Sequence, residues 1–240
     1  MKAQDIWAVV PAKDGTAAKG RLAGVLDRRE RRDLFRAMLE DVLNCLSRVD
    51  GLSGTIVVTH DAHASALART FGARVVREAR NEGQSAAVRS AAAVLSAEGA
   101  TTLLAVPGDV PMIAAGEIEA VMEAHHRAPS VTLVPARDGR GTNCLVCSPP
   151  DSIEPVFGTD SFARHQAAAR RLGIRAEVVL LPGLGLDVDT PGDLGALLGR
   201  PLSGKTGRYL EASGIAARLG SESRAHPAEA REKRVDAGPS

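Results

Sequence analysis

Residues 55–76 read TIVVTHDAHASALARTFGARVV, and this stretch contains a strand pattern, a helix pattern and a second strand pattern in succession. Residues 55–59 are mostly β-branched, which favours a strand, and residues 62–70 predict a helix that ends at Gly72. Residues 73–76 end in two valines and predict the next strand. A strand, a helix and a strand joined by short loops form the unit from which parallel sheets are built.

The same alternation continues on both sides of this unit. Further strands are predicted at residues 6–10 and 101–106, and further helices at residues 33–47, 85–97 and 115–126. Short aliphatic strands that alternate with amphipathic helices are typical of a mainly parallel sheet covered by helices on both faces. We therefore expect a three-layer, Rossmann-like α/β fold that binds ligands at the carboxyl ends of its strands.

The pattern changes after Ser130, which predicts a sheet edge or an insertion. Strands are expected at residues 131–134, 142–146 and 176–181, and helices at residues 161–172 and from Pro191 onward. We expect a single domain over residues 1–202. Because Gly, Ser, Arg, Ala and Glu prevail afterwards, residues 203–240 are expected to form a partly disordered extension with a weak helical pattern at residues 209–219.

The composition favours a small ligand over nucleic acid or a membrane. The 240 residues include 30 Lys and Arg against 29 Asp and Glu, so the broad positive surface of a nucleic-acid or membrane binder is not expected. Only 2% of residues are aromatic, which argues against base-stacking platforms. Three cysteines, no signal-peptide pattern and no long apolar run indicate a cytoplasmic protein. The sequence leaves open whether the chain forms a homodimer.

The segment after the first predicted strand reads PAKDGTAAKGRL at residues 11–22 and carries three cations, Lys13, Lys19 and Arg21. Its glycines let backbone N–H groups approach phosphate oxygens, whose charge the cations neutralise. The spacing differs from that of a Walker A motif. Because the segment follows a strand of the predicted sheet, a phosphate-binding loop is the favoured interpretation, and a solvated surface loop is the alternative.

Two acidic segments are candidates for binding a metal ion. Asp109 directly follows an aliphatic strand, where a carboxylate needs a cation, and Mg²⁺ that bridges carboxylate and phosphate oxygens would supply it. Asp187 and Asp189 are two residues apart, so both face the same way if the segment is extended. The alternatives are helix N-caps: Asp109 for the helix that follows it, and Asp189 or Thr190 for the helix at Pro191.

Two turn-like segments rich in glycine and hydroxyl groups are candidates for substrate binding. They are residues 141–143 and residues 156–162, and in the second Gly158, Thr159 and Ser161 lie at the start of a predicted helix. Helix N-termini bind anions, so these residues could hold a phosphorylated substrate. Capping of the helix alone is the alternative, with Ser161 as the N-cap.

Two further features are expected to be structural. Cys144 and Cys147 form a CxxC without a second pair of ligands, and on a strand they face opposite sides, so both are expected to pack in the core. His165 lies in a helix of Arg and Ala, and we expect it on the surface, with contact to the substrate as the alternative.

Several stretches together resemble one enzyme family. They are WAVVPAK and AKGRL near the N-terminus, PGDVP in the centre, GTNCLVCSPP and VFGTDSFARH after it, and LDVDTPGDL around residue 190. In this order, over about residues 6–198, they resemble the 2-phospho-L-lactate guanylyltransferases of coenzyme F-420 biosynthesis, which are related to the molybdenum-cofactor nucleotidyltransferases. The resemblance implies a nucleotide-diphospho-sugar transferase-like fold and a cytoplasmic enzyme that uses Mg²⁺.

The resemblance also implies a reaction and a set of site residues. The enzyme would transfer GMP from GTP to 2-phospho-L-lactate, phosphoenolpyruvate or 3-phospho-D-glycerate and release pyrophosphate. The implied catalytic residues are Lys13, Lys19, Arg21 and Asp109, and the implied metal ligands are Asp109, Asp187 and Asp189. Acceptor binding is implied for Thr142, Gly158 and Ser161, and nucleotide binding for Pro11, Ala12, Gly83, Ser85 and Gly108.

One stretch departs from the family pattern. Relatives usually carry a GLNxAL-like sequence before the third helix, where this chain has GQSAAV at residues 83–88. Two alternative functions follow from the residues: a nucleotidyltransferase for another acceptor, such as molybdopterin or a sugar phosphate, and a nucleotide-binding domain without turnover. The three candidate carboxylates argue against the second, because a protein that only binds a triphosphate has little need of them.

Overall fold

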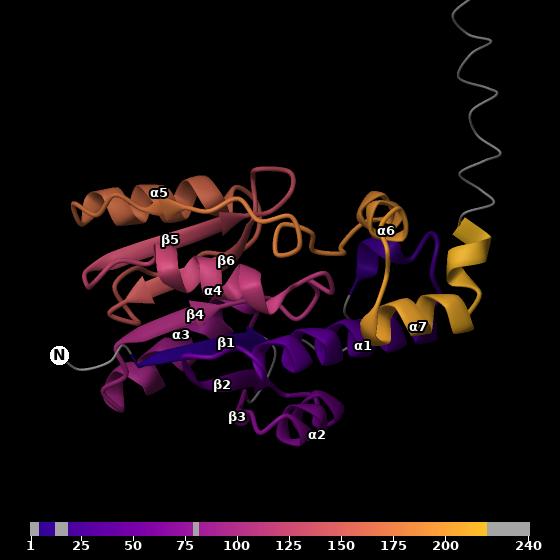
Figure 1. Cartoon of the computed structure of the whole chain (residues 1–240), viewed down its shortest axis with the longest axis horizontal. Coiled ribbons are helices and arrows are strands. Elements are labelled where there is room, and N and C mark those ends of the chain that lie inside the picture. Colours follow the sequence, from indigo (N-terminus) through magenta and orange to yellow (C-terminus); the bar gives the residue numbers. More distant parts are fainter. Residues whose placement is uncertain (1–4, 13–18, 79–81, 220–240) are drawn as a thin grey trace, which may run out of the picture.

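The computed structural model describes residues 5–12, 19–78 and 82–219, which form a three-layer α/β/α fold (Figure 1). The central sheet has seven strands in the order β3-β2-β1-β4-β6-β5-β7. The strands are β1 (Ile6–Pro11), β2 (Leu52–Thr59), β3 (Arg74–Arg77), β4 (Thr102–Ala105), β5 (Ser130–Pro135), β6 (Thr142–Ser148) and β7 (Glu177–Val178). The helices are η1 (Gly20–Leu22), α1 (Arg28–Leu46), α2 (Ala62–Thr70), α3 (Gln84–Ala97), α4 (Ala115–Ala124), α5 (Ser161–Arg171), α6 (Pro191–Leu198) and α7 (Gly204–Ala212).

Two hydrophobic clusters fill the space between the layers. On one face of the sheet, α1, α2, α4, α6 and α7 pack over side chains such as Val10 and Leu104, and on the other face α3 and α5 pack over Val9 and Leu103. Neighbouring residues of one strand therefore enter opposite clusters, as a pleated strand requires. The expected α/β class, with helices on both faces of a mainly parallel sheet, is confirmed.

The strand directions explain where a ligand site can form. β1 pairs in parallel with β2 on one side and with β4 on the other, so the chain order reverses between β1 and β4. In open α/β sheets, ligands bind at the carboxyl ends of the strands at such a reversal. β6 runs antiparallel to both β4 and β5, which brings its first residues, Thr142 and Asn143, to the same edge of the sheet.

Several elements differ from the expected bounds, and two of them show the physical reason. Helix α1 begins at Arg28 rather than at residue 33, because Asp27 and Glu30 form a reciprocal capping box in which each side chain accepts the other residue's backbone N–H. Its first turns carry mostly charged residues and so lack the apolar spacing on which the expectation depended. The strand expected over residues 176–181 is limited to Glu177–Val178, after which the chain leaves the sheet edge and Leu180 is 77% exposed.

The described part of the chain after residue 202 adds to the same core. Helix α7 lies beside α1 (Figure 1), and Leu210 and Ile215 are fully buried in the cluster that α1 forms. The Asp41 carboxylate of α1 accepts the backbone N–H groups of Lys205 and Thr206, which satisfies the first turn of α7. A domain limit at residue 202 stays a prediction. Among the described helices, none has the length and apolar character needed to cross a membrane.

Candidate functional site

A cavity of 660 Å³ lies at the carboxyl edge of the sheet, between the end of β4 and the start of β6. Four segments supply most of its lining: the loop after β4 with Asp109, the β5–β6 turn with Arg137 and Arg140, the start of α5 with Ser161, and residues 187–190. Its size is in the usual range for small-ligand sites. The only two non-glycine residues in the described ranges with positive φ, Lys19 and Asp160, lie beside it. Such backbone strain is frequent at functional sites.

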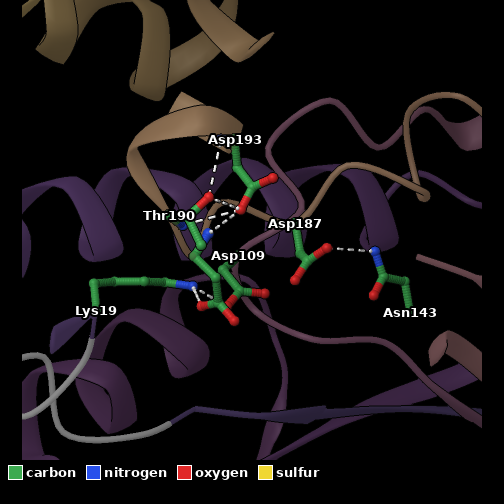
Figure 2. A network of polar contacts seen from close by, with 7 residues as sticks. Lys19, Asp109, Asn143, Asp187, Thr190 and Asp193 are labelled. Carbon is green, nitrogen blue, oxygen red and sulfur yellow. Dashed lines mark hydrogen bonds and ion pairs between the residues drawn. The ribbon is translucent and has the colours of Figure 1, made fainter. Parts of the chain in front are cut away.

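Lys19 is the buried cation of the site. Its side chain is 3% exposed, and its ammonium group donates to the Asp109 carboxylate and, at 2.6 Å, to Asp189 Oδ1 (Figure 2). Burial alone would lower the pKa of Lys19, but the two carboxylates outweigh it and raise the pKa above its ordinary value. Lys19 therefore stays charged and holds two loops together that are far apart in the sequence.

Asp109 faces the cavity and does not cap a helix. The N-cap of α4 is Ala114, so the N-cap alternative for Asp109 is wrong. The Asp109 backbone carbonyl accepts the Val188 N–H at 3.1 Å, which joins the loop after β4 to the acidic segment before α6. Asp109 Oδ1 is buried and has no hydrogen-bond partner among the described residues. A buried carboxylate oxygen of this kind is available to a cation.

Asp187 and Asp189 bind different partners. Asp187 Oδ1 accepts from Asn143 Nδ2 at 3.1 Å, and the same amide donates to the Leu184 carbonyl at 2.9 Å (Figure 2). The N-cap of α6 is Thr190, in a capping box with Asp193, so of the two N-cap alternatives Thr190 is confirmed and Asp189 is wrong. Burial, together with the neighbouring charges of Asp109 and Asp189, raises the pKa of Asp187 to about 6.

The raised pKa of Asp187 makes its ionised form costly in the folded state. Because the pKa of about 6 lies above the ordinary 3.8, this group contributes stability that is fully present below about pH 4 and is lost as the pH rises through 6. Asp187→Asn keeps the shape and removes the charge. In a chelator-containing buffer at pH 7.5, we expect Asp187→Asn to unfold roughly 4–12 °C above the wild type, from a shift worth about 2–3 kcal/mol.

Calorimetry at two pH values tests this expectation. The gain should shrink towards zero at pH 4, where wild-type Asp187 is protonated. An equal gain at both pH values would mean that the effect comes from packing and not from charge.

The predicted acceptor-binding residues Thr142, Gly158 and Ser161 line the same cavity, and together they are called the acceptor wall. Thr142 begins β6, Gly158 lies in the loop before α5, and Ser161 is the first residue of α5, and all three line the cavity. The N-cap is Asp160 and not Ser161, so the expected capping role of Ser161 is wrong. The Ser161 hydroxyl is buried and, among the residues that the structure describes, has no hydrogen-bond partner.

The predicted nucleotide-binding residues lie at or near the ends of β1 and β4 and at the start of α3. Pro11 ends β1, Ala12 donates its N–H to the Val58 carbonyl, and Gly108 lies so close to α1 that a Cβ there would meet Leu39 at 3.0 Å. Gly83 is the N-cap of α3 with φ of 95°, and Ser85 Oγ accepts the Phe157 N–H at 2.9 Å. Arg21 is exposed on η1 and lines the cavity. Lys13 lies outside the described residues.

Sequence reasoning did not identify the roles of four residues around the cavity. Asn143 is buried and orients Asp187, while Arg137 and Arg140 lie on the cavity wall and pair with Asp193 and Asp160, each at 2.8 Å. His165 was expected on the surface, but it is fully buried and bonds Thr142. The burial of Asn143 depends on the antiparallel direction of β6, which the strand pattern does not reveal.

The charge of the cavity fits a divalent cation. Six aspartates and three arginines line it. The aspartates are Asp109, Asp138, Asp160, Asp187, Asp189 and Asp193, and the arginines are Arg21, Arg137 and Arg140. A polyphosphate would meet an excess of negative charge there, which hard cations with oxygen ligands relieve. As the described side chains are arranged, no three acidic, His or Cys residues converge into a metal-binding group. The unpaired Asp109 Oδ1 and the raised pKa of Asp187 nevertheless fit Mg²⁺ in chemistry.

The two cysteines are packing residues, as expected. Cys144 and Cys147 are free and buried, and they enter opposite hydrophobic clusters. Burial raises the pKa of Cys147 to about 12, so its thiol stays protonated and unreactive.

The chain is similar to guanylyltransferases over most of its length. A family model described as guanylyl transferase CofC like matches residues 6–231. The phosphoenolpyruvate guanylyltransferase of Conexibacter woesei is 40% identical over 192 residues, which cover 80% of this chain and 86% of that protein. The 3-phospho-D-glycerate guanylyltransferase of Colwellia psychrerythraea is 36% identical over 197 residues, 81% and 93% of the two chains. A crystal structure of 4-diphosphocytidyl-2C-methyl-D-erythritol synthase shares the fold, with a TM-score of 0.58 at 15% identity over 81% of this chain and 97% of that one.

Proposed function

Because the chain belongs to the CofC-like guanylyltransferase family, we propose that it transfers GMP from GTP to a phosphorylated three-carbon acid, with release of pyrophosphate. Phosphoenolpyruvate is the acceptor that we place first, and 3-phospho-D-glycerate and 2-phospho-L-lactate are the other two. The product would then serve coenzyme F-420 biosynthesis, which the family resemblance implies.

One observation supports this function above the others. A single cavity is lined by Asp109 and Asp189, whose shared partner is Lys19, and by the acceptor wall, which includes Thr142 and the unpaired Ser161 hydroxyl. The first set suits a triphosphate with its metal ion, and the acceptor wall suits a smaller anion. Two anionic substrates held in one cavity are what transfer of a nucleotidyl group to a phosphorylated acid requires.

We propose direct in-line transfer without a general base. A phosphate monoester is already anionic near neutral pH, because its second pKa is about 6, so an acceptor phosphate oxygen can attack the α-phosphorus of GTP directly. Lys19 and Arg21 would neutralise the triphosphate, and Thr142, Gly158 and Ser161 would hold the acceptor. Catalysis then depends on positioning and on charge neutralisation.

Asp109, Asp187 and Asp189 would hold Mg²⁺. A bound divalent ion supplies charge neutralisation at the phosphate oxygens. To bind the metal ion, the Asp189 carboxylate would give up at least part of its ion pair with Lys19. The Lys19 ammonium group would then be available to the triphosphate. Asn143 would keep the Asp187 carboxylate oriented both with and without the metal ion.

A matrix of donors and acceptors tests this proposal. The full chain is incubated with each of ATP, CTP, GTP and UTP, and with phosphoenolpyruvate, 3-phospho-D-glycerate, 2-phospho-L-lactate or a sugar phosphate, while pyrophosphate is measured. We expect pyrophosphate only with GTP and a three-carbon phospho-acid, and a new diphosphate linkage in the ³¹P spectrum. Turnover with CTP and a sugar phosphate, or GTP binding without any pyrophosphate, would contradict the proposal.

A further inference from the structure

His165 lies fully buried beneath the acceptor wall and bonds two separate segments. Its Nδ1 is 3.0 Å from the Thr142 hydroxyl, and its Nε2 accepts the backbone N–H of Val156 at 2.9 Å. The ring also stands edge-on to Phe157, with 5.2 Å between the ring centroids. Thr142 and Phe157 line the cavity, so the imidazole acts on the cavity only through them.

The Val156 contact determines which ring nitrogen carries the proton. A backbone N–H can only donate, so Nε2 must accept and is unprotonated. The neutral ring then carries its hydrogen on Nδ1 and donates it to Thr142 Oγ1. If the Thr142 hydroxyl donated to Nδ1 instead, both ring nitrogens would lack a proton, which a neutral imidazole does not allow. In a doubly protonated ring, two donors would face each other, the Nε2–H and the Val156 N–H.

This tautomer leaves the Thr142 hydroxyl with one hydrogen to donate. The oxygen accepts from His165, and the Thr142 side chain makes no other hydrogen bond within the part of the chain that the structure describes. Thr142 is 5% exposed and lines the cavity. Its hydrogen is therefore available to an oxygen of a bound molecule, and an anionic oxygen is the strongest acceptor.

We propose that His165 is a positioning residue that makes the Thr142 hydroxyl a dedicated hydrogen-bond donor to the phosphorylated acid. That the ligand is this acid rests on the proposed function. Through Val156 the same ring holds the segment before Gly158, and the Phe157 N–H joins that segment to Ser85 at the start of α3. One buried side chain thus links the acceptor wall to the predicted nucleotide side.

Two variants of His165 separate its two hydrogen bonds. In His165→Asn, the amide Nδ2–H can replace the Nδ1–H donor to Thr142 but cannot reach Val156. In His165→Gln, the amide oxygen can replace Nε2 towards Val156, while the donor to Thr142 is lost. Thr142→Val removes the hydroxyl and keeps the shape of the side chain. Thermal unfolding of each variant shows whether the fold is retained.

With phosphoenolpyruvate as the acceptor and GTP as the donor, we expect the variants to change the KM for the acceptor and not the KM for GTP. His165→Gln and Thr142→Val should each raise the KM for phosphoenolpyruvate by about tenfold or more, because a hydrogen bond to a charged group is lost, and leave the KM for GTP within about twofold. His165→Asn keeps the donor to Thr142 and should therefore raise the KM for phosphoenolpyruvate less than His165→Gln does. The double variant Thr142→Val/His165→Gln should have the same KM for phosphoenolpyruvate as Thr142→Val alone, because both changes remove the same hydrogen bond.

A second readout does not depend on turnover. In protein labelled with ¹⁵N-histidine, the His165 signals, assigned by their loss in His165→Asn, should show a protonated Nδ1 and an unprotonated Nε2. An Nε2–H tautomer, additive effects in the double variant, or equal loss for both substrates would overturn the proposal. A wild type with no guanylyl transfer would contradict the proposed function instead, while the tautomer would still be measurable.

Discussion

Asp109→Ala is expected to lower kcat by about a thousandfold or more while the chain stays folded. Asp109 joins the end of β4 to the buried ammonium of Lys19, and its second oxygen has no hydrogen-bond partner within the described ranges. Removing it takes away the central proposed metal ligand, and charge neutralisation in a water-poor site contributes several kcal/mol to catalysis. Pyrophosphate release at saturating GTP, phosphoenolpyruvate and Mg²⁺ measures the loss.

A matched variant separates this effect from a general loss of charge. Asp50→Ala removes an exposed carboxylate at the turn between α1 and β2, and it should keep wild-type turnover. Circular dichroism of Asp109→Ala should match the wild type, since Lys19 keeps Asp189 as a partner. If Asp109→Ala kept more than a tenth of the wild-type rate with Mg²⁺, Asp109 could not be an essential metal ligand.

The sequence predicted the fold well because local patterns carry that information. Helix α2 and the start of α5 have the expected bounds, and the two faces of β6 follow from the alternation of Cys144 and Cys147. Errors arose where a local pattern was weak: the charged first turns of α1 depend on a capping box, and β7 depends on pairing with β5.

The candidate site was predicted in part, and the rest depends on tertiary contacts. Strand ends located Lys19 and Asp109, since parallel strands bring their carboxyl ends together. That Lys19 reaches Asp189, 170 residues later in the chain, follows only from the folded structure. His165 shows the same limit, because a helix pattern of Arg and Ala gives no sign that one histidine lies under β6.

Lys19→Met is expected to affect both stability and catalysis. The side chain is 3% exposed, so its removal leaves the Asp109 and Asp189 carboxylates without their buried partner. Breaking a buried ion pair costs about 3–5 kcal/mol, and we expect the low end because Asp189 is 40% exposed. At roughly 2–4 °C for each kcal/mol, the Tm should fall by roughly 6–12 °C. Turnover with GTP should fall about a hundredfold or more, because a cation on the triphosphate is lost.

Divalent cations distinguish the role of Lys19 from that of an ordinary ion pair. Without the ammonium, the carboxylates of Lys19→Met should bind Mg²⁺ in the absence of nucleotide, so millimolar Mg²⁺ should raise its Tm more than that of the wild type. Lys205→Met, which breaks the more exposed 2.7 Å pair with Glu40, should lose about 1 kcal/mol or less and show no extra response to Mg²⁺. Equal Mg²⁺ responses in wild type and Lys19→Met would mean that Lys19 and the metal do not share these carboxylates.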